Sequence, residues 1–486
     1  PRPRSPSSSS EGRPVGSEMA MRPLLLLPEI VVFLGGLTVL VSGSFLPRTR
    51  QWVTRVIAAV ALVAAAILAA VDLPGLGQPA MEGTFTVDTA TGVARIVAAL
   101  GTLIVLALAS DEIAGSPRES ETYALFLFST TGTLVLAGAD DLLVVVVGFL
   151  LASIPLYGLI GIARTPRGAE AAMKTYLLGA LFGILLLLGV TLLYGVSATT
   201  SYADLTDRLA EAPQGVVAAS VVAVLGGLMF KAGGVPGHFW VPDAAEGAGG
   251  AVAAFLTTVP KIGAMVAAYR LIAMLPDTLA WPLLVAVLAV ASMTLGNLAA
   301  YWQTDPRRLL GWSTVSQVGY LLVPVAVAGR SDLALPALLL YLAGYTVTNL
   351  AAFAVTTAFP DRRDLDSYRG MGRARPWLGA SLVVALLGLV GTPPTVVFAG
   401  KLTTTAAAWD GGLAWLAVLV FVNTVISLFY YLRWIAPVYG RGEPPARTPP
   451  GAFIPAAWSA TTAVVTAGLS LALGIGAGAL WSVLSV

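Results

Sequence analysis

Residues 228–243 read LMFKAGGVPGHFWVPD and close a strongly apolar segment with a lysine, three glycines, two prolines and the only histidine of the chain. Glycine and proline within an apolar run leave backbone amides and carbonyls without helical partners. In a bilayer such groups are tolerated only where protein buries them or where they line water. The stretch therefore predicts a membrane helix that breaks after Lys231, inside the protein and beside a wet interior.

The rest of the chain is equally apolar. It is 57% hydrophobic and 11% charged, with a mean hydropathy of +0.83, whereas soluble domains carry about 25% charged residues. About fourteen segments have the roughly 20 apolar residues that a spanning helix needs. They lie near 24–45, 53–71, 92–110, 121–138, 142–163, 171–195, 215–236, 250–272, 280–302, 308–328, 334–358, 377–403, 412–438 and 453–484. Because the runs are continuous rather than alternating, we predict an all-α polytopic membrane protein without strands, and not a β-barrel.

Charged residues separate into two sets of loops. The loops after the first, fifth, ninth, eleventh and thirteenth segments carry arginines: Arg48, Arg50, Arg55, Arg164, Arg167, Arg307, Arg308, Arg362, Arg363, Arg369, Arg373, Arg375, Arg441 and Arg447. The alternate loops carry acids: Asp72, Glu82, Asp88, Asp204, Asp207, Glu211, Asp277 and Asp410. The positive-inside rule makes the basic loops cytoplasmic and predicts both termini outside. Loop 111–120 departs from this scheme, because it is acidic where the scheme predicts a cytoplasmic loop.

Residues 1–20 are rich in proline and serine and predict a disordered tail. The apolar run that follows is too long for a signal peptide and lacks a small-residue cleavage site. We expect translation to start at Met19 or Met21.

The type of cation is more informative than the net charge. The chain has four lysines, and its other 24 cations are arginines. Arginine keeps its proton, whereas a buried lysine can lose it. Each buried lysine costs roughly 2.5–3.5 kcal/mol at a helix centre and typically marks an ion path. Lys174, Lys231, Lys261 and Lys401 all fall in predicted helices and are candidate proton carriers; the alternative is that their ammonium groups snorkel to the headgroups.

A second break is predicted at GTPP, residues 391–394, just before Lys401. Paired breaks in corresponding helices are typical of transporter sites built on inverted repeats. The broken helices would be the seventh and the twelfth. We therefore predict two inverted five-helix repeats, 121–272 and 280–438, after three N-terminal helices in 21–120 and before a C-terminal helix in 453–484. A plain proline kink is the alternative at each break.

His238 follows the first break and titrates near neutral pH, so it is either a proton-passing group or a structural histidine. Asp243 and Glu246, on the same loop, are expected to cap or orient at the cytoplasmic surface. The absence of cysteine excludes disulfides and iron–sulfur ligation, and one histidine argues against a haem or zinc site. No glycine-rich phosphate loop follows a strand, so no nucleotide site is expected.

Several phrases, in order, resemble the antiporter-like membrane subunits of respiratory NADH:quinone oxidoreductase (complex I), and among them the subunit N family, whose mitochondrial counterpart is NADH dehydrogenase subunit two. The resemblance covers about residues 24–440. The phrases are LLPEIVVFL, EAAMKTYLLGA, GLMFKAGGVPGHFW, AAFLTTVPKIGA, TLGNLAAYWQTDPRRLLGWSTVSQVGYLL, GLVGTPPTVVFAGK and FVNTVISLFYYLR.

The resemblance implies a proton pump in a bacterial inner membrane that is driven by electron transfer on other subunits. By position, Lys231 would be the proton-accepting lysine of the input half-channel, Lys261 the central relay and Lys401 the terminal lysine, with Lys174 in support. NADH, FMN, iron–sulfur clusters and quinone would be bound by other subunits. The partners would be membrane-arm subunits of the K and M types and the lipid bilayer, with no nucleic acid.

Two departures from the family stand out. Its fifth helix carries a glutamate where this chain has Leu150, in GFLLASIPLYG, so the glutamate–lysine pair of Lys231 is missing, although Asp141 at the helix start matches. Either another acid serves, or Lys231 works unpaired, or the subunit pumps differently. Gln317 stands where the family often has a histidine, and Gly237 where a phenylalanine is usual; Ser313, Thr314 and Ser316 are candidates to line a water wire.

Three hypotheses follow. The first is a proton-translocating subunit N, which has no activity alone. The second is a stand-alone cation/proton antiporter. The third, motivated by Leu150 and Gln317, is a scaffold that has lost pumping. The retention of all four lysines argues against the scaffold, because idle buried charges are costly.

Overall fold

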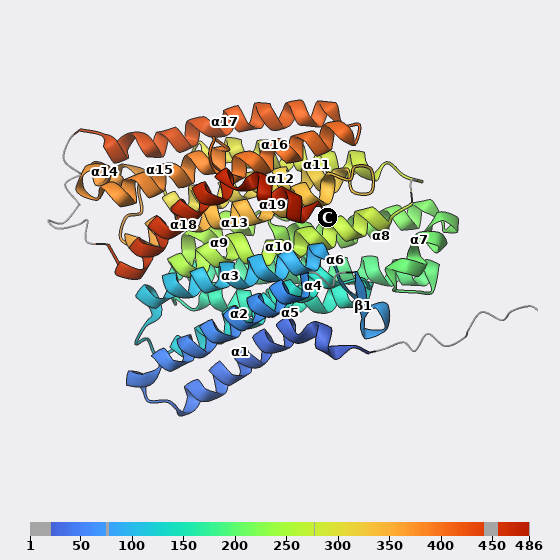
Figure 1. Cartoon of the computed structure of the whole chain (residues 1–486), viewed down its shortest axis with the longest axis horizontal. Helices are drawn as coiled ribbons and strands as arrows, with labels where there is room; N and C mark the ends of the chain where they lie inside the picture. Colours follow the sequence, from blue (N-terminus) through green and yellow to red (C-terminus); the bar gives the residue numbers. More distant parts are fainter. Residues whose placement is uncertain (1–20, 74–76, 277, 442–454, 486) are drawn as a thin grey trace, which may run out of the picture.

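The computed structural model describes residues 21–73, 77–276, 278–441 and 455–485. Its long helices run side by side along one axis and form a single bundle (Figure 1). The long helices are α1 (Leu27–Phe45), α2 (Trp52–Asp72), α3 (Thr89–Ile113), α4 (Glu119–Gly138), α5 (Leu142–Gly161), α6 (Pro166–Ser197), α8 (Gln214–Ala232), α10 (Gly250–Met274), α11 (Trp281–Ala300), α12 (Pro306–Ala326), α13 (Ala334–Ala358), α15 (Pro376–Val390), α16 (Val396–Asp410), α17 (Ala414–Tyr439) and α18 (Ala457–Ile475). Short helices are α7 (Tyr202–Glu211), α9 (Trp240–Gly247), α14 (Met371–Ala374), α19 (Ala477–Leu484) and the 3-10 turns η1 (Pro23–Leu26), η2 (Arg48–Arg50), η4 (Met81–Gly83) and η5 (Leu365–Tyr368).

The prediction of an all-α polytopic membrane fold is confirmed. Among the described residues, 12 helices are long and apolar enough to cross a membrane. Two of the predicted segments fall outside that set: α4, which begins with Glu119 and Glu121, and the pair α15–α16, which a break divides into two short pieces. The count of fourteen and the grouping into inverted repeats stay predictions. The predicted tail 1–20 and residues 453–454 of the last segment lie outside the described residues.

Both predicted breaks are present. α8 ends at Ala232 and is followed by Gly233 at φ +83°, and α15 ends at Val390 and is followed by Gly391 at φ +93°. At both sites the amide of the glycine and that of the next residue bond back to carbonyls of the last helical turn, as in a Schellman cap. Glycine is the residue that adopts this left-handed conformation without a Cβ penalty. Each helix therefore ends where its glycine stands, and a short segment leads to α9 or α16.

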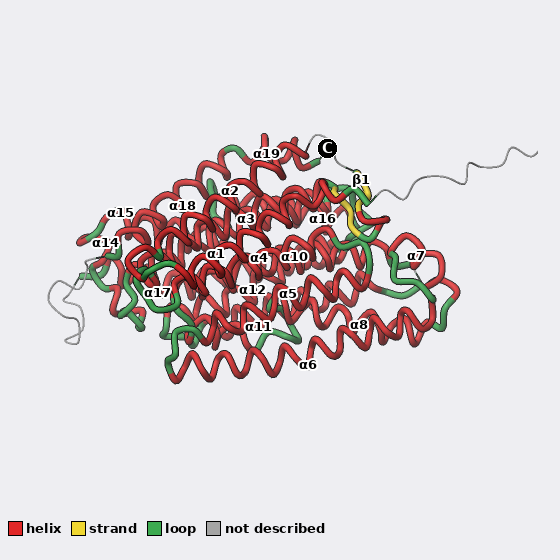
Figure 2. Tube along the Cα trace, turned by 90° about the horizontal axis from the view of Figure 1, so that it is seen from below, coloured by secondary structure: helices red, strands yellow, loops and turns green. Residues whose placement is uncertain are grey.

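The prediction that the chain has no strands is wrong. β1 (Gln78–Ala80) and β2 (Phe85–Val87) form an antiparallel hairpin between α2 and α3. Figure 2 shows it in yellow at one end of the bundle, against the ends of the red helices. Phe85 and Val87 are buried against Leu25 and Leu26. The hairpin covers this end of the bundle. The backbone groups of its two strands, which are outside the helices, form hydrogen bonds with each other.

The charges divide the bundle into two ends. We call the end with the loops after α1, α5, α11 and α13 the basic end, and the opposite end the acidic end. Asp111 and Glu112 are acids at the basic end, and their contacts explain the departure noted in the sequence. Glu112 accepts hydrogen bonds from the amides of Gly250 (2.6 Å) and Ala251 (3.0 Å), and Asp111 accepts from the amide of Ser459 (2.7 Å). Both carboxylates thus cap helix N-termini, of α10 and α18, where the helix dipole stabilises negative charge.

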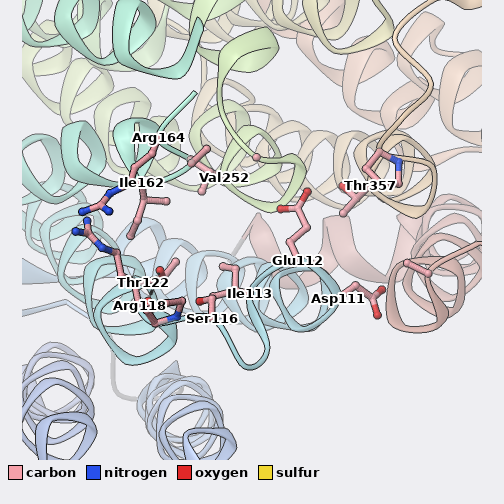
Figure 3. Close-up of a pocket in the computed structure, with 15 residues that line it drawn as sticks. Asp111, Glu112, Ile113, Ser116, Arg118, Thr122, Ile162, Arg164, Val252 and Thr357 are labelled. Atoms are coloured by element: carbon pink, nitrogen blue, oxygen red, sulfur yellow. Dashed lines mark hydrogen bonds between the residues drawn. The ribbon is translucent and has the colours of Figure 1, made fainter. Parts of the chain in front are cut away.

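Figure 3 shows these two carboxylates directed away from each other at the end of α3, beside a cavity of ≈ 510 Å³. Arg118 and Arg164 line another part of that cavity. The acidic loop therefore has a structural role at the basic end and does not contradict the division into two ends.

The centre of the bundle is formed by α10, α12 and α13. Nearly all residues of these three helices are buried, whereas α1, α2, α6, α17 and α18 expose large apolar side chains along much of their length. The helix that carries Lys261 is thus surrounded by protein on every side. The exposed apolar helices form the outer surface of the bundle.

Candidate functional site

Three of the four predicted lysines are buried in the bundle. The exposed fraction is 2% for Lys231 at the end of α8, 0% for Lys261 in the middle of α10 and 5% for Lys401 in α16. Lys174 on α6 differs, because 47% of its side chain is exposed. Burial of three ammonium groups in an apolar bundle is costly, and such residues in membrane proteins usually mark functional sites.

Lys231 is held by a hydroxyl group. Its Nζ donates to the Oγ of Ser153 on α5 at 3.0 Å, and that Oγ donates to the carbonyl of Phe149 at 2.6 Å. No carboxylate of the described residues lies within ion-pair distance of this Nζ. A serine therefore occupies the place on α5 that faces the lysine.

Leu150 does not face Lys231. Its side chain is 40% exposed and lines a surface groove of ≈ 480 Å³ together with Phe33, Phe128 and Ile154. The groove lies between α1, α4 and α5 and is almost wholly apolar. The position at which the family carries its glutamate is thus part of an outer apolar surface, one helical turn from the serine that contacts Lys231.

Lys261 has a buried Nζ with no hydrogen-bond partner among the described residues. A Cβ built on Gly233 would stand 3.9 Å from this Nζ. The glycine at the first break therefore leaves room beside the ammonium group, and α10 brings its lysine directly to the break that follows Lys231. Lys231 and Lys261 therefore lie at the same break. Lys231 precedes it in the sequence, and Lys261 faces it from α10.

Lys401 contacts the second break. Its Nζ donates to the carbonyl of Val390 at 2.8 Å and to the hydroxyl of Thr424 at 3.4 Å, and it stands 3.8 Å from the ring centroid of Tyr320, within cation–π range. Val390 is the last residue of α15. The lysine thus satisfies a carbonyl that the break leaves free.

Gln317 completes the same helix end. Its Nε2 donates to the carbonyl of Leu389 at 2.9 Å, and its Oε1 accepts from the hydroxyl of Tyr341 at 2.5 Å. Gln317 and Lys401 therefore bind two consecutive carbonyls at the end of α15. The glutamine supports the polar network where the family often has a histidine.

Further polar contacts join α10 to α12 and α13. Tyr345 donates to the carbonyl of Thr257 at 2.6 Å, and its hydroxyl lies 3.1 Å from that of Thr314; Asn349 donates to the hydroxyl of Thr257 at 3.0 Å. Tyr341 and Tyr345 lie one turn apart on α13. Hydroxyl and amide groups of α12 and α13 thus bond to the helix of Lys261 and, one turn away, to the break at Lys401. Sequence reasoning missed most of them, because tyrosines and threonines scattered along apolar helices carry no distinctive pattern.

The two other predicted serines also bond within the bundle. Ser313 pairs with the hydroxyl of Tyr431, and Ser316 donates to Asn297 at 2.8 Å. Asn297 in turn donates to Asn423 on α17. These bonds connect α11, α12 and α17.

His238 lies in the turn between α8 and α9 and is 3% exposed. Its ring lies tilted against those of Phe239 and Trp312, with centroid distances of 4.1 Å and 5.8 Å, and its Nδ1 has no hydrogen-bond partner among the described residues. An unpaired ring nitrogen in a buried turn is able to accept a proton or a water. The structure thus places His238 at the break, in an aromatic surrounding.

A buried ion pair between α1 and α3 was not among the predicted sites. Arg95 donates through Nε and Nη2 to the two carboxylate oxygens of Glu29 at 2.7 Å and 2.8 Å, and also to the carbonyl of Leu25. Their side chains are 1% and 5% exposed. The signal was a carboxylate in the first apolar segment, LLPEIVVFL, because such residues in membrane helices are usually paired.

The comparisons with known proteins agree with this geometry. The family described as NADH:quinone oxidoreductase/Mrp antiporter, TM, matches residues 139–427. NADH-quinone oxidoreductase subunit N of Mycobacterium sp. (strain JLS) is 65% identical over 96% of this chain and 99% of its own length. The chain belongs to the NADH-quinone oxidoreductase subunit N family.

Solved structures resemble this subunit N family member along nearly its whole length. One chain of respiratory complex I from Thermus thermophilus with bound aureothin has a TM-score of 0.80 and 30% identity, covering 94% of this chain and 99% of that one. A chain of the Mrp complex from Dietzia sp. DQ12-45-1b has a TM-score of 0.79 and 25% identity, covering 95% and 96%. The antiporter-like fold that the sequence predicted is therefore shown.

Among the described residues of this family member, no group of three or more histidine, aspartate and glutamate side chains is arranged to hold a metal ion. Redox groups on other chains stay an expectation of the resemblance.

Proposed function

We propose that the chain is a proton-translocating membrane-arm subunit of an NADH:quinone oxidoreductase, driven by electron transfer on other subunits. Protons would move along the buried lysines and the polar groups between them. We expect the redox groups on other subunits, so this chain alone would not pump protons. It would work in a large hetero-oligomer, as complex I and the Mrp complex do in the organisms named above.

One observation carries this proposal: Lys231, Lys261 and Lys401 are all buried, and each lies at a helix break. A broken helix exposes backbone groups that bind water or ions in the middle of a membrane protein. A desolvated lysine is able to switch between charged and neutral forms, which arginine cannot do. Buried lysines at breaks thus supply sites where a proton is taken up and released.

The membrane orientation belongs to the same proposal. With the basic end in the cytoplasm, the loops after α1, α5, α11 and α13 obey the positive-inside rule. The described N-terminal and C-terminal helices, α1 and α19, would then begin and end on the outer side of a bacterial plasma membrane.

The likeness to an Mrp complex favours a second candidate, a cation/proton antiporter that works apart from electron transfer. Such a protein would exchange sodium or potassium for protons without NADH. The buried lysines fit both NADH-driven pumping and cation/proton exchange. The experiment must therefore distinguish proton movement that needs NADH from proton movement driven by a sodium or potassium gradient. A scaffold without pumping is the third candidate.

The test is replacement of Lys261 by alanine in the chromosome, followed by assays of inverted membrane vesicles. NADH-driven acidification and quinone reduction are measured, with co-purification of the NADH-oxidising subunits as the assembly control. We expect both activities to fall together, because the central proton site is lost. Val259→Ala on the same buried helix removes apolar atoms only and is expected to retain both activities.

Unchanged acidification and quinone reduction in assembled Lys261→Ala complexes would contradict the proposal and favour the scaffold. Sodium- or potassium-driven proton exchange that persists without NADH in the wild type, and is lost in Lys261→Ala, would favour the antiporter.

A further inference from the structure

The short helix α9 is surrounded by charged side chains at the basic end. Asp243 and Glu246 stand one turn apart on α9, and cations approach them from α6 and α12. We call this set the α9 ion cluster. Its members are Arg167, Glu170, Lys174, Asp243, Glu246 and Arg308.

Asp243 is shared between two helices. One of its carboxylate oxygens lies 3.0 Å from Nζ of Lys174 on α6, and the other 2.6 Å from Nη1 of Arg308 on α12. The same Arg308 nitrogen lies 2.9 Å from Glu246. α9 is thus tied by ion pairs to helices on both of its sides, and it also packs against α10.

Lys174 is doubly paired. Besides Asp243, its Nζ lies 2.7 Å from Glu170 one turn earlier on α6. The cluster lines an open, mostly polar surface cavity of ≈ 280 Å³. This surrounding is the opposite of that of Lys231, Lys261 and Lys401, which are buried and have no carboxylate partner among the described residues.

α9 contacts the first break through a hydrogen bond and through side-chain packing. Nε1 of Trp240, its first residue, donates to the carbonyl of Phe230 at 2.9 Å, across the break. A Cβ on Gly233 would lie 2.6 Å from Val241 of α9 and 3.9 Å from Nζ of Lys261. A shift of α9 would therefore move Val241 against the glycine beside the central lysine.

We propose that Lys174 is a positioning residue, which anchors α9 through Asp243 as a fixed cation and does not carry protons. The inference rests on the proposed function, because what α9 positions is the break between Lys231 and Lys261. This inference assigns Lys174 a different role from Lys231, Lys261 and Lys401, whereas the resemblance implied that all four lysines belong to the proton path. A cation that only holds α9 through Asp243 does not need to release its proton.

Arginine is the discriminating substitution, because it keeps the charge and cannot deprotonate. Lys174→Arg, Lys174→Ala and Lys261→Arg are made in the full complex, and NADH-driven acidification is measured in inverted vesicles. We expect Lys174→Arg to match the wild type in rate and in pH profile. Lys174→Ala should fall about two- to fivefold, the effect of losing a partly exposed ion pair, and Lys261→Arg should fall to background.

Asp243→Asn removes the pair with Lys174 and also the pair with Arg308, so acidification should fall at least as far as in Lys174→Ala. Adding Lys174→Ala to Asp243→Asn should lower acidification little further, because the Lys174–Asp243 pair is already lost. The matched control is Arg369→Ala, which removes a cation from an i,i+3 pair with Asp366 at the same end of the bundle, away from α9. It is expected to leave acidification unchanged.

Assembled Lys174→Arg complexes that pump as poorly as Lys174→Ala would overturn the inference, because the residue would then need to release a proton. Wild-type rates in Lys174→Ala would overturn it too, since no anchor would be needed. If Lys261→Arg and Lys261→Ala pump normally, the proposed function itself fails, whatever happens at Lys174.

Discussion

At the scale of single residues, the environment decides what a lysine can do. Lys231 contacts a hydroxyl, Lys261 contacts no partner among the described residues, Lys401 contacts a carbonyl and an aromatic ring, and Lys174 contacts two carboxylates. Only the fourth surrounding supplies negative charge beside the ammonium group. The same residue type thus stands in two kinds of environment in one chain.

Gln317 gives a prediction at this scale. Gln317→Leu leaves the carbonyl of Leu389 and the hydroxyl of Tyr341 without their partner, and unsatisfied buried polar groups cost about 1–3 kcal/mol each. We expect lower thermal stability of the complex and a clear loss of NADH-driven acidification.

Gln317→His is the control for that change, because a neutral imidazole both donates and accepts. It should retain most of the acidification that Gln317→Leu loses. Equal acidification in the leucine and histidine variants would show that the polar contacts of residue 317 are not needed.

Sequence reasoning reached part of this site. It selected the three buried lysines because lysine is rare and out of place in apolar segments. It did not separate Lys174 from them, because the carboxylate of Asp243 that holds it lies 69 positions away in the sequence. It noted that the glutamate paired with Lys231 in the family is missing at Leu150; in the structure Ser153 faces the lysine and Leu150 is turned outward.

At the scale of elements, the two breaks are the features that position the site. Each consists of a capped helix end, a glycine at positive φ and a short second helix. A Cβ on Gly391 would stand 2.9 Å from Cδ of Lys401, so the side chain of the lysine would have to shift. The glycine therefore fixes both the backbone turn and the place of the lysine.

Gly391→Ala is the prediction for this element. The left-handed conformation costs a non-glycine residue roughly 1–2 kcal/mol, and the added methyl group would displace Lys401 from the carbonyl of Val390. We expect acidification to fall while the amount of assembled complex changes little. Gly412→Ala is a matched control, because that glycine also has positive φ but meets no atom within 4 Å; an equal loss in both variants would assign the effect to backbone strain alone.

The breaks were predictable from the sequence because glycine and proline have strong local preferences. The β1–β2 hairpin was not, because two strands of three residues each are too short to show alternation. For the α9 ion cluster, the sequence predicted only that Asp243 and Glu246 cap or orient. The cations of the cluster come from α6 and α12, which are distant in the sequence, so their pairing with α9 was not predictable.

At the scale of the whole molecule, the first three helices are joined to the rest by polar contacts as well as apolar packing. Glu29 and Arg95 pair between α1 and α3, and Arg270 on α10 donates to Asp88 at 2.6 Å and to the carbonyl of Ala137 at 3.0 Å. The helix of the central lysine is therefore fixed at its acidic end to α3 and α4. Glu112 fixes its other end, as described above.

The Glu29–Arg95 pair gives the prediction at this scale. Glu29→Gln leaves a buried guanidinium without its carboxylate, which typically costs about 3–5 kcal/mol. We expect little of that variant to assemble, as measured by the amount of chain that co-purifies with the complex. The double variant Glu29→Leu, Arg95→Leu removes both charges and should assemble better than the single one; the reverse order would show that the pair itself is required.

The central helices α10, α12 and α13 are less apolar than most of the spanning helices that come before them in the chain. α10 carries a lysine, and α12 carries two arginines, two serines, a threonine and a glutamine, while the strongly apolar α1, α2, α5 and α6 precede them in the chain. Segments of such composition partition into a bilayer less readily than the helices before them. We expect the ribosome-bound chain to hold α10 and α12 at the translocon until α13 emerges, so that the centre of the protein enters the membrane as a group, beside the N-terminal helices and before α17 and α18.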